Sequence, residues 1–247
     1  MGQEVKEDGL LGRRLRVLQP TRGYRAGMDA ALLAAACPAR PGQTVVEAGC
    51  GPGAVLLQVA ARCPQVTLFG LEREAPAAEL ARANAASNGL SDRITVAMGD
   101  VAAGFRALEQ PPFDWALSNP PFFDDETALR APAAERRAAW IADDGLQAWT
   151  GFLGKAVREG GSIVMIHRAD RLADILALLS PKAGSFQIRP IHGFADQPAK
   201  RVLVRAIKTG KAPLQLLPPL ILHDRSGAGH TAQAEAILKG DAALDWA

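Results

Sequence analysis

The sequence predicts an α/β protein whose mostly parallel sheet carries helices on both faces. Short apolar segments with strand character alternate with segments of helical period between residues 44 and 118, and short connections join them. The first of these strands, 44–48, has the composition of a buried strand. Two further strands near 186–192 and 201–208 are close enough in the chain to form a hairpin. They complete a seven-stranded sheet with an antiparallel last strand.

Each predicted element has a local signal in the chain. Residues 15–18 alternate as a strand does, and Asp29 is a suitable N-cap for a helix that ends before Pro38. Asn88-Gly89 is a typical helix end. Residues 123–144 interrupt the alternation with a long, charged connection, which is typical of a lid or substrate-binding element. The remaining predicted strands are 66–71, 93–98, 113–118 and 162–166, and the predicted helices are 30–36, 54–63, 75–87, 101–109, 146–158 and 171–179.

Composition excludes several classes of protein. The 247 residues are 48% hydrophobic, which is enough for one substantial core. No apolar run approaches the ~20 residues that a membrane span needs, and the N-terminus has no apolar signal core. The three cysteines, Cys37, Cys50 and Cys63, are odd in number and lack metal-type spacing. We therefore expect reduced thiols, no metal site, and a cytoplasmic protein without membrane contact.

Charge divides the chain into three parts. Residues 44–150 carry 8 Lys and Arg against 14 Asp and Glu, a net of −6. Residues 1–43 carry 7 against 4, a net of +3, and residues 151–247 carry 13 against 8, a net of +5. An acidic centre with basic flanks suits the binding of a polyanion such as RNA. We expect phosphate contacts from Arg13–Arg25 and Arg189–Lys211, with an ordinary solvated surface as the alternative.

A glycine-rich loop follows the first buried strand. Gly49, Gly51 and Gly53 lie between that strand and a segment of helical period, and such a loop lets the backbone approach a nucleotide closely. Glu72 ends the next strand, 19 residues after Gly53, where an acidic side chain accepts hydrogen bonds from ribose hydroxyls. Glu47 is expected to orient the loop. The loop alone fits NAD and S-adenosylmethionine comparably well.

The tetrapeptide Asn119-Pro120-Pro121-Phe122 directly follows the fourth predicted strand. Two prolines cannot continue a sheet, because each fixes φ and lacks an N–H, so the chain leaves the sheet in a stiff geometry. Ligands of open α/β sheets bind at this carboxyl edge. The Asn119 amide oxygen and the Pro120 carbonyl can accept the two N–H bonds of an amino group, while the Phe122 ring stacks on a flat molecule.

Taken in order along the chain, these features resemble a known family. The glycine loop, Glu72, Asp100 and the Asn-Pro-Pro-Phe motif look like the class I S-adenosylmethionine-dependent methyltransferases that modify exocyclic or amide nitrogens. Asp100 follows the third strand of the alternating core, where its carboxylate can accept from an adenine amino group. The segments 19–33 and 218–231 extend the resemblance to the bacterial family typified by the valine-tRNA adenine-N6 methyltransferase. One departure is His230, where an aromatic residue is expected.

The resemblance implies a Rossmann-like fold, S-adenosylmethionine as cofactor, and transfer of a methyl group to adenine N6 in RNA, most simply tRNA. It implies three parts: a basic N-terminal extension packed on the core (1–43), the methyltransferase domain (44–210) and a C-terminal extension of that domain (211–247). Methylation of a protein glutamine, methylation of rRNA or another nucleic acid, and cofactor binding without catalysis remain alternatives. The implied catalytic residues are Asn119, Pro120 and Phe122, and the implied cofactor-binding residues are Asp29, Glu47, Gly49, Gly51, Gly53, Glu72, Asp100 and Asn119.

Overall fold

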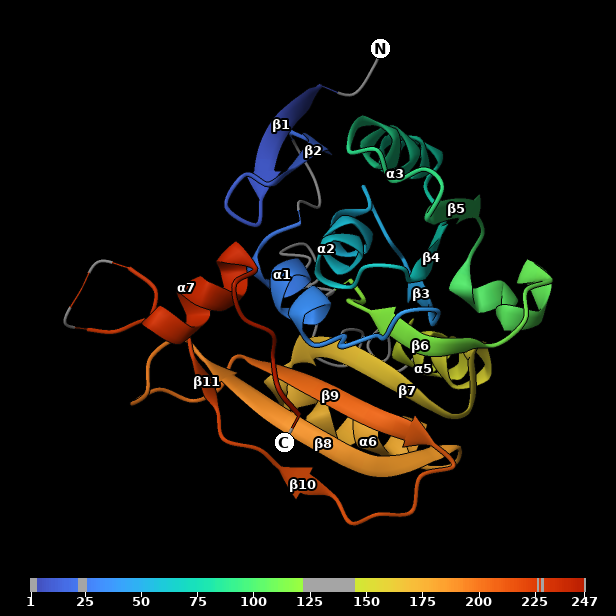
Figure 1. The fold of residues 1–247 in the computed structure, drawn as a ribbon. Coiled ribbons are helices and arrows are strands. Elements are labelled where there is room, and N and C mark those ends of the chain that lie inside the picture. The colour runs from blue at the N-terminus through green and yellow to red at the C-terminus, as the bar shows by residue number, and fades with distance from the viewer. Residues whose placement is uncertain (1–3, 22–25, 122–144, 226, 228, 247) are drawn as a thin grey trace, which may run out of the picture.

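The computed structural model describes residues 4–21, 26–121, 145–225, 227 and 229–246 and is built around one large sheet (Figure 1). The strand order of this nine-stranded sheet is β10-β8-β9-β7-β6-β3-β4-β5, and β11 also pairs with β8. Its seven principal strands are β3 (Thr44–Ala48), β4 (Thr67–Glu72), β5 (Ile94–Met98), β6 (Phe113–Ser118), β7 (Val157–Arg168), β8 (Ala183–His192) and β9 (Arg201–Lys208).

The strand directions confirm the predicted Rossmann-like arrangement. The pairs β3–β4, β3–β6, β4–β5 and β6–β7 are parallel, whereas β9 is antiparallel to both β7 and β8. Two short strands, β10 (Gln215–Leu216) and β11 (Leu220–Ile221), extend the sheet beside β8. Each has only two residues, which is too few to show the alternation of a strand, so the sequence does not predict them.

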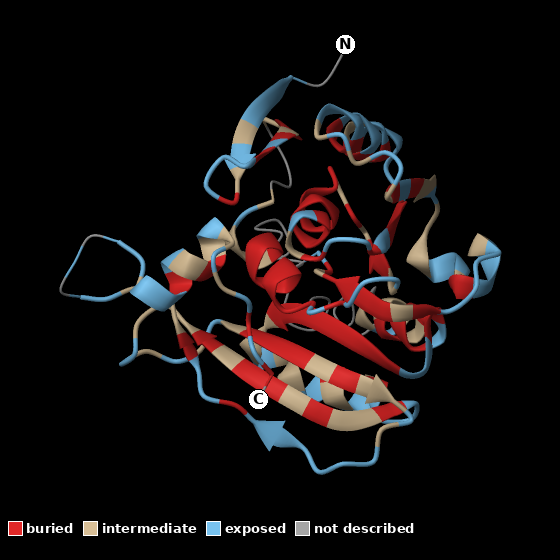
Figure 2. Cartoon of the chain, viewed as in Figure 1, coloured by how far each residue is buried: buried red, intermediate tan, exposed pale blue. Residues whose placement is uncertain are grey.

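Helices cover both faces of the sheet, as predicted. On one face lie α1 (Met28–Ala35), α2 (Ala54–Arg62) and α3 (Ala75–Ser87), and on the other lie α5 (Gly145–Ala156) and α6 (Leu172–Leu179) (Figure 1). Successive residues of a strand point to opposite faces, so each strand contributes to two cores. Val45 belongs to one core and Val46 to the other. Figure 2 shows the resulting buried interior. No helix among the described residues is long and apolar enough to span a membrane.

Two local predictions are wrong. Residues 101–109 form two short 3₁₀ turns, η1 (Val101–Ala103) and η2 (Phe105–Leu108), because Gly104 between them has φ +79°. Asp29 does not cap α1, since the N-cap residue is Gly27, which has no side chain to cap the helix. The Asp29 carboxylate instead accepts a hydrogen bond of 2.9 Å from Arg201 Nε at the start of β9.

The N-terminal hairpin, β1 (Val5–Leu10) and β2 (Leu15–Pro20), is held to α3 by two asparagines one helical turn apart. Asn84 accepts from Leu18 N (2.7 Å) and donates to Leu18 O (2.9 Å), and Asn88 makes the same two bonds with Arg16 (3.0 and 2.7 Å). The two amides thus pair with β2 as a neighbouring strand would. Asn84 is fully buried and also donates to Pro52 O at 2.9 Å.

The C-terminal segment after α7 (Ala232–Lys239) packs against α1 and the sheet. Trp246 is 5% exposed, and its indole N–H donates to Ala36 O at 2.9 Å. Arg189 donates to Pro218 O at 2.8 Å and to Asp245 O, and the Arg205 guanidinium lies 5.1 Å from the Trp115 ring and 6.0 Å from the Trp246 ring. Arginines of the sheet therefore bind this segment through the Asp245 carbonyl and the Trp246 indole ring.

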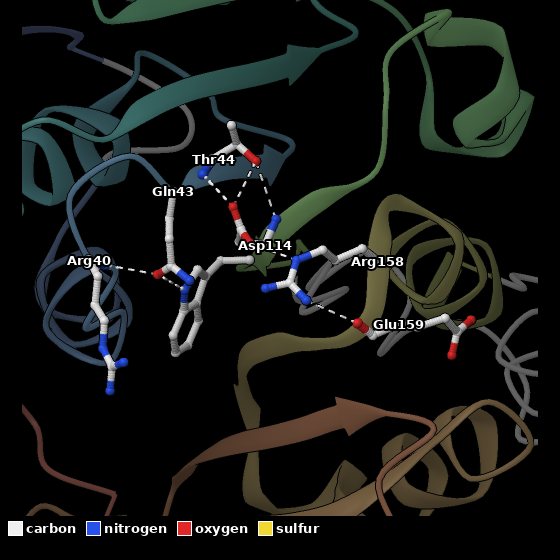
Figure 3. A network of polar contacts seen from close by, with 7 residues as sticks. Arg40, Gln43, Thr44, Asp114, Arg158 and Glu159 are labelled. Carbon is white, nitrogen blue, oxygen red and sulfur yellow. Dashed lines mark hydrogen bonds and ion pairs between the residues drawn. The ribbon is translucent and has the colours of Figure 1, made fainter.

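A polar network at the amino edge of the sheet sets the alignment of β3 with β6 (Figure 3). Asp114 accepts from Thr44 N at 2.8 Å and from Arg158 Nε at 2.7 Å, while Gln43 accepts from the Trp115 indole N–H at 3.0 Å. Burial alone would raise the pKa of Asp114, but the Thr44 N–H and the Arg158 guanidinium lower it overall. The charged carboxylate thus joins two strands, whose far ends then lie side by side.

Candidate active site

Strand ends and their loops meet in register at the carboxyl edge of the sheet. Ala48 at the end of β3 pairs with Ser118 at the end of β6 and with Leu71 in β4. The buried Ser118 hydroxyl also donates to Ala48 O at 3.2 Å. The Asn-Pro-Pro motif after β6 and the glycine loop after β3 therefore begin beside each other at the carboxyl edge.

The glycine loop is a tight backbone cradle that opens onto α2. Gly49, Gly51 and Gly53 all have positive φ (+69°, +52° and +83°), a region that side chains other than glycine rarely occupy. Leu71 O accepts from both Gly49 N (2.8 Å) and Cys50 N (3.0 Å), so the loop is fixed to β4. Gly53 is the N-cap of α2 and supplies no side-chain cap. Its helix therefore presents backbone N–H groups and the positive end of its dipole toward the loop.

Glu72, the last residue of β4, closes the other side of this loop. Its two oxygens accept from Gly51 N and Glu74 N, each at 2.8 Å. Every carboxylate oxygen has two lone pairs, so the group retains capacity for ribose hydroxyls. Glu47 lies deeper, 2% exposed, and burial together with the Glu72 carboxylate raises its pKa well above the usual range. A backbone N–H bond from Leu56 in α2 opposes this rise, which is consistent with the orienting role we expected for Glu47.

Asp100 follows β5 on the outer side of Glu72, because Glu72 pairs with Met98 at the end of that strand. One of its oxygens accepts from Ala102 N at 2.8 Å and so caps the first 3₁₀ turn. The other lies 3.5 Å from the Arg73 guanidinium, and the side chain is 38% exposed. The carboxylate is therefore anchored at the strand end and accessible there.

The predicted catalytic motif directly follows β6, and β6 pairs with β3, which leads into the glycine loop. Asn119 is partly buried, Pro120 is buried and Pro121 is exposed. The Asn119 amide oxygen itself is shielded from solvent. The Pro120 carbonyl and the Asn119 amide oxygen are thus two hydrogen-bond acceptors on adjacent residues, and few rotatable bonds separate them. Phe122 and the predicted lid at 123–144 lie outside the described residues.

Trp149 is a site residue that the sequence analysis missed. It is a partly buried residue of α5, and its ring packs on Gly49 so closely that a Cβ at Gly49 would lie 2.3 Å from the ring carbon Cη2. The contact joins positions a hundred residues apart, and a tryptophan in an amphipathic helix carries no local sign of it. Gly49 is therefore required both by its positive φ and by this ring.

These residues fit S-adenosylmethionine. The three glycines with positive φ leave the backbone open to close approach, the uncapped start of α2 suits a carboxylate, and Glu72 and Asp100 offer acceptors for hydroxyl and amino groups. Asp29 lies in the first turn of α1 and pairs with Arg201, and its contact with the cofactor stays a prediction.

Replacement of Glu72 tests the cofactor assignment. In Glu72→Ala the cofactor loses a charged acceptor worth roughly 1.5–3 kcal/mol, so we expect its Kd to rise about 10- to 150-fold. Isothermal titration calorimetry with S-adenosylmethionine measures this change, and Glu79→Ala, an exposed carboxylate on α3, is the matched control. Two results would contradict the assignment. One is tight binding of NAD with no measurable heat of binding for S-adenosylmethionine, and the other is an unchanged Kd for S-adenosylmethionine in Glu72→Ala.

Comparison with known proteins shows the family to which the chain belongs. Residues 25–137 match the model of the methyltransferase small domain family. A tRNA1(Val) (adenine(37)-N6)-methyltransferase from Porphyromonas gingivalis is 30% identical over 214 residues, which cover 82% of this chain and 83% of that protein. A solved structure of a predicted O-methyltransferase from Agrobacterium tumefaciens has a TM-score of 0.73 at 27% identity, covering 87% of this chain and 98% of that one.

A more distant structure agrees in fold alone. An S-adenosylmethionine-dependent O-methyltransferase from Thermotoga maritima has a TM-score of 0.54 at 15% identity, covering 78% of this chain and 69% of that one. The similarity at 30% identity extends over most of both chains. The chain is therefore an S-adenosylmethionine-dependent methyltransferase and belongs to the family of the tRNA1(Val) (adenine(37)-N6)-methyltransferases.

Proposed function

We propose that this protein methylates the exocyclic N6 amino group of an unpaired adenine in tRNA. The observation that carries the proposal is the position of Asn119, directly after β6 and beside the glycine loop that begins after β3. The relatives from Porphyromonas gingivalis are named for adenine 37 of tRNA1(Val), which supports adenine as the acceptor.

The protein has to activate a poor nucleophile. The lone pair of an aromatic amine is delocalised into its ring. Asn119 Oδ1 and the Pro120 carbonyl each accept one N–H, which draws the nitrogen toward tetrahedral geometry and directs its lone pair. The same two oxygens stabilise the positive charge that develops on nitrogen. S-adenosylmethionine supplies the electrophilic methyl group, and the cradle of Gly49, Gly51 and Glu72 would hold it beside Asn119.

No general base has to act before the transfer, because the amine attacks through its own lone pair. Alignment of donor and acceptor in one site accounts for much of the rate. Phe122 stays a prediction as the ring that stacks on the adenine and keeps it out of the RNA stack. Single-stranded loops offer such bases at low cost, which supports an anticodon loop as the target.

The basic surface that we propose for RNA is smaller than the sequence alone suggested. Arg189 is 8% exposed and Arg205 lies between two indole rings, so both hold the C-terminal segment instead of contacting phosphates. Arg201 pairs with Asp29. The exposed cations Arg13 and Arg16 on the hairpin remain suitable for phosphate contacts.

The experiment is to incubate the protein with labelled S-adenosylmethionine and bulk tRNA and to analyse the digested nucleosides by mass spectrometry. We expect N6-methyladenosine. Arg13→Glu and Arg16→Glu should weaken tRNA binding and lower its salt dependence by roughly 0.7–0.9 in slope for each lost phosphate contact. Lys182→Glu, an exposed cation far along the chain from the hairpin, is the matched control.

Other outcomes would redirect the proposal. A 2′-O-methylated nucleoside would show that this protein methylates an oxygen atom, as the name of the Agrobacterium tumefaciens protein describes. Label on a protein glutamine with none on RNA would establish the glutamine alternative. Label on rRNA with none on tRNA would keep the chemistry and change the substrate.

A further inference from the structure

A pocket lies along α2, the helix that follows the proposed cofactor cradle. It has a volume of about 580 Å³ and lies between the β1–β2 hairpin, α1, α2 and α7. In Figure 1 the hairpin lies above α1 and α2, and α7 lies to their left. Gln58 of α2 lines it, and this residue is five positions after the cradle residue Gly53, or about 7.5 Å along the helix axis. A pocket of this size can hold a nucleoside.

Gln58 gives this pocket an acceptor that lacks a donor. The side chain is 1% exposed, and its Nε2 donates to Ala54 O at 3.1 Å. Its Oε1 is buried and has no hydrogen-bond partner among the described residues. A buried acceptor left unpaired destabilises the folded protein, so its retention in a pocket wall points to a ligand that brings an N–H or O–H group.

His230, in the outer wall of the pocket, is the end of a row of planar groups. Its ring stacks on His223 at 4.8 Å between centroids with 27° between planes, and His223 lies 5.5 Å from Phe194. The Arg225 guanidinium covers Phe194 at 4.9 Å and is held there by Asp196. His230 is exposed, so a further flat group can extend the row.

We propose that this pocket holds an unpaired base of the RNA substrate next to the adenine that is methylated, an inference that rests on the proposed function. The base stacks on His230, and the Gln58 amide, whose Oε1 is shielded from solvent in the free protein, turns toward the pocket to accept an N–H from the base. Stacking on exposed rings together with hydrogen bonds to a base edge is how proteins read splayed single-stranded RNA.

The charges in the pocket favour a base over a phosphate. Its acidic groups are Asp8, bonded to Gln19 at 3.2 Å, and Glu235, paired with Lys239 at 2.7 Å. The one Lys or Arg among the described lining residues is Lys239, and Glu235 already pairs with it, so the lining offers no spare cation for a phosphate. The phosphates of the bound strand would then lie outside it, toward Arg13 and Arg16 of the same hairpin.

The test uses an RNA hairpin whose loop carries 2-aminopurine beside the target adenine. With the wild-type protein we expect methylation and quenching of the 2-aminopurine fluorescence by stacking. His230→Ala should raise the RNA Kd about 5- to 100-fold and abolish the quenching, whereas His230→Phe, which keeps a ring, should retain both. The affinity for S-adenosylmethionine should not change in either variant.

Gln58→Met separates a ligand-binding role from a structural one. Removing an unpaired buried acceptor should raise the melting temperature of the free protein by about 2–4 °C for each kcal/mol gained, while the RNA Kd rises. Gln233→Met, on the exposed surface of α7, should change neither quantity. A lower melting temperature in Gln58→Met would make the side chain structural and overturn its assignment.

Failure of this inference can be told from failure of the proposed function. If the wild type methylates the hairpin while His230→Ala and Gln58→Met bind and quench as the wild type does, the pocket holds no base and the activity stands. If the wild type methylates no RNA, both proposals are overturned together.

Discussion

In Asn119→Ala, methyl transfer should fall by about 10²–10³ because one preorganised acceptor at the reacting nitrogen is lost. Cofactor affinity should change far less, since the glycine loop and Glu72 are intact in this variant. Single-turnover rates with saturating S-adenosylmethionine and tRNA measure the first quantity, and calorimetry measures the second.

Two variants sharpen this result. Asn119→Asp keeps an acceptor oxygen in the same place, so it should retain more activity than Asn119→Ala. Ser118→Ala removes the neighbouring hydroxyl that bonds Ala48 O, and it should leave the transfer rate close to that of the wild type. Turnover near the wild-type rate in Asn119→Ala would remove this side chain from the mechanism.

The second large effect concerns stability. Trp246→Ala should lower the free energy of unfolding by about 3–5 kcal/mol, which is the range for deleting a buried aromatic side chain. The indole is 5% exposed, donates to Ala36 O and lies beside the Arg205 guanidinium, so its loss leaves a cavity and an unpaired carbonyl. The total free energy of unfolding of a native protein is about 5–15 kcal/mol, so the variant should unfold at a much lower urea concentration.

Leu216→Ala is the matched control for Trp246→Ala. Leu216 belongs to the same C-terminal region but is 69% exposed in β10, so its truncation should change stability by less than about 0.5 kcal/mol. Equal stability of Trp246→Ala and the wild type would show that the C-terminal segment does not stabilise the sheet.

The strands and long helices were predictable because their signals are local. The strands 113–118 and 201–208 and the helix 75–87 have the predicted bounds, since strand composition, helical period and end signals all occur within each segment. The helix at 101–109 failed because Gly104 takes a positive φ that the surrounding helical period conceals. The strands β10 and β11 exist only through pairing with β8.

The candidate site also has a part that the sequence predicts and a part that it does not. Motifs that follow consecutive parallel strands meet at one edge, so the proximity of the glycine loop, Glu72, Asp100 and Asn119 could be inferred from their order. Contacts between distant segments could not. The approach of Trp149 to Gly49 and the burial of Arg189 depend on packing that no single segment encodes. Counting basic residues therefore overestimated the surface available to RNA.

The Asn84 side chain has a thermodynamic consequence. One buried amide binds Leu18 in the hairpin and Pro52 in the glycine loop, so the hairpin cannot shift away from α3 without disturbing the loop. If RNA binds the hairpin and the cofactor binds the loop as proposed, a change at one of these places would reach the other through this amide. Linkage would then require the same factor in both directions, so a cofactor that tightens RNA binding would itself be bound more tightly by the RNA-bound protein. A single asparagine thereby joins the hairpin proposed for RNA to the loop proposed for the cofactor.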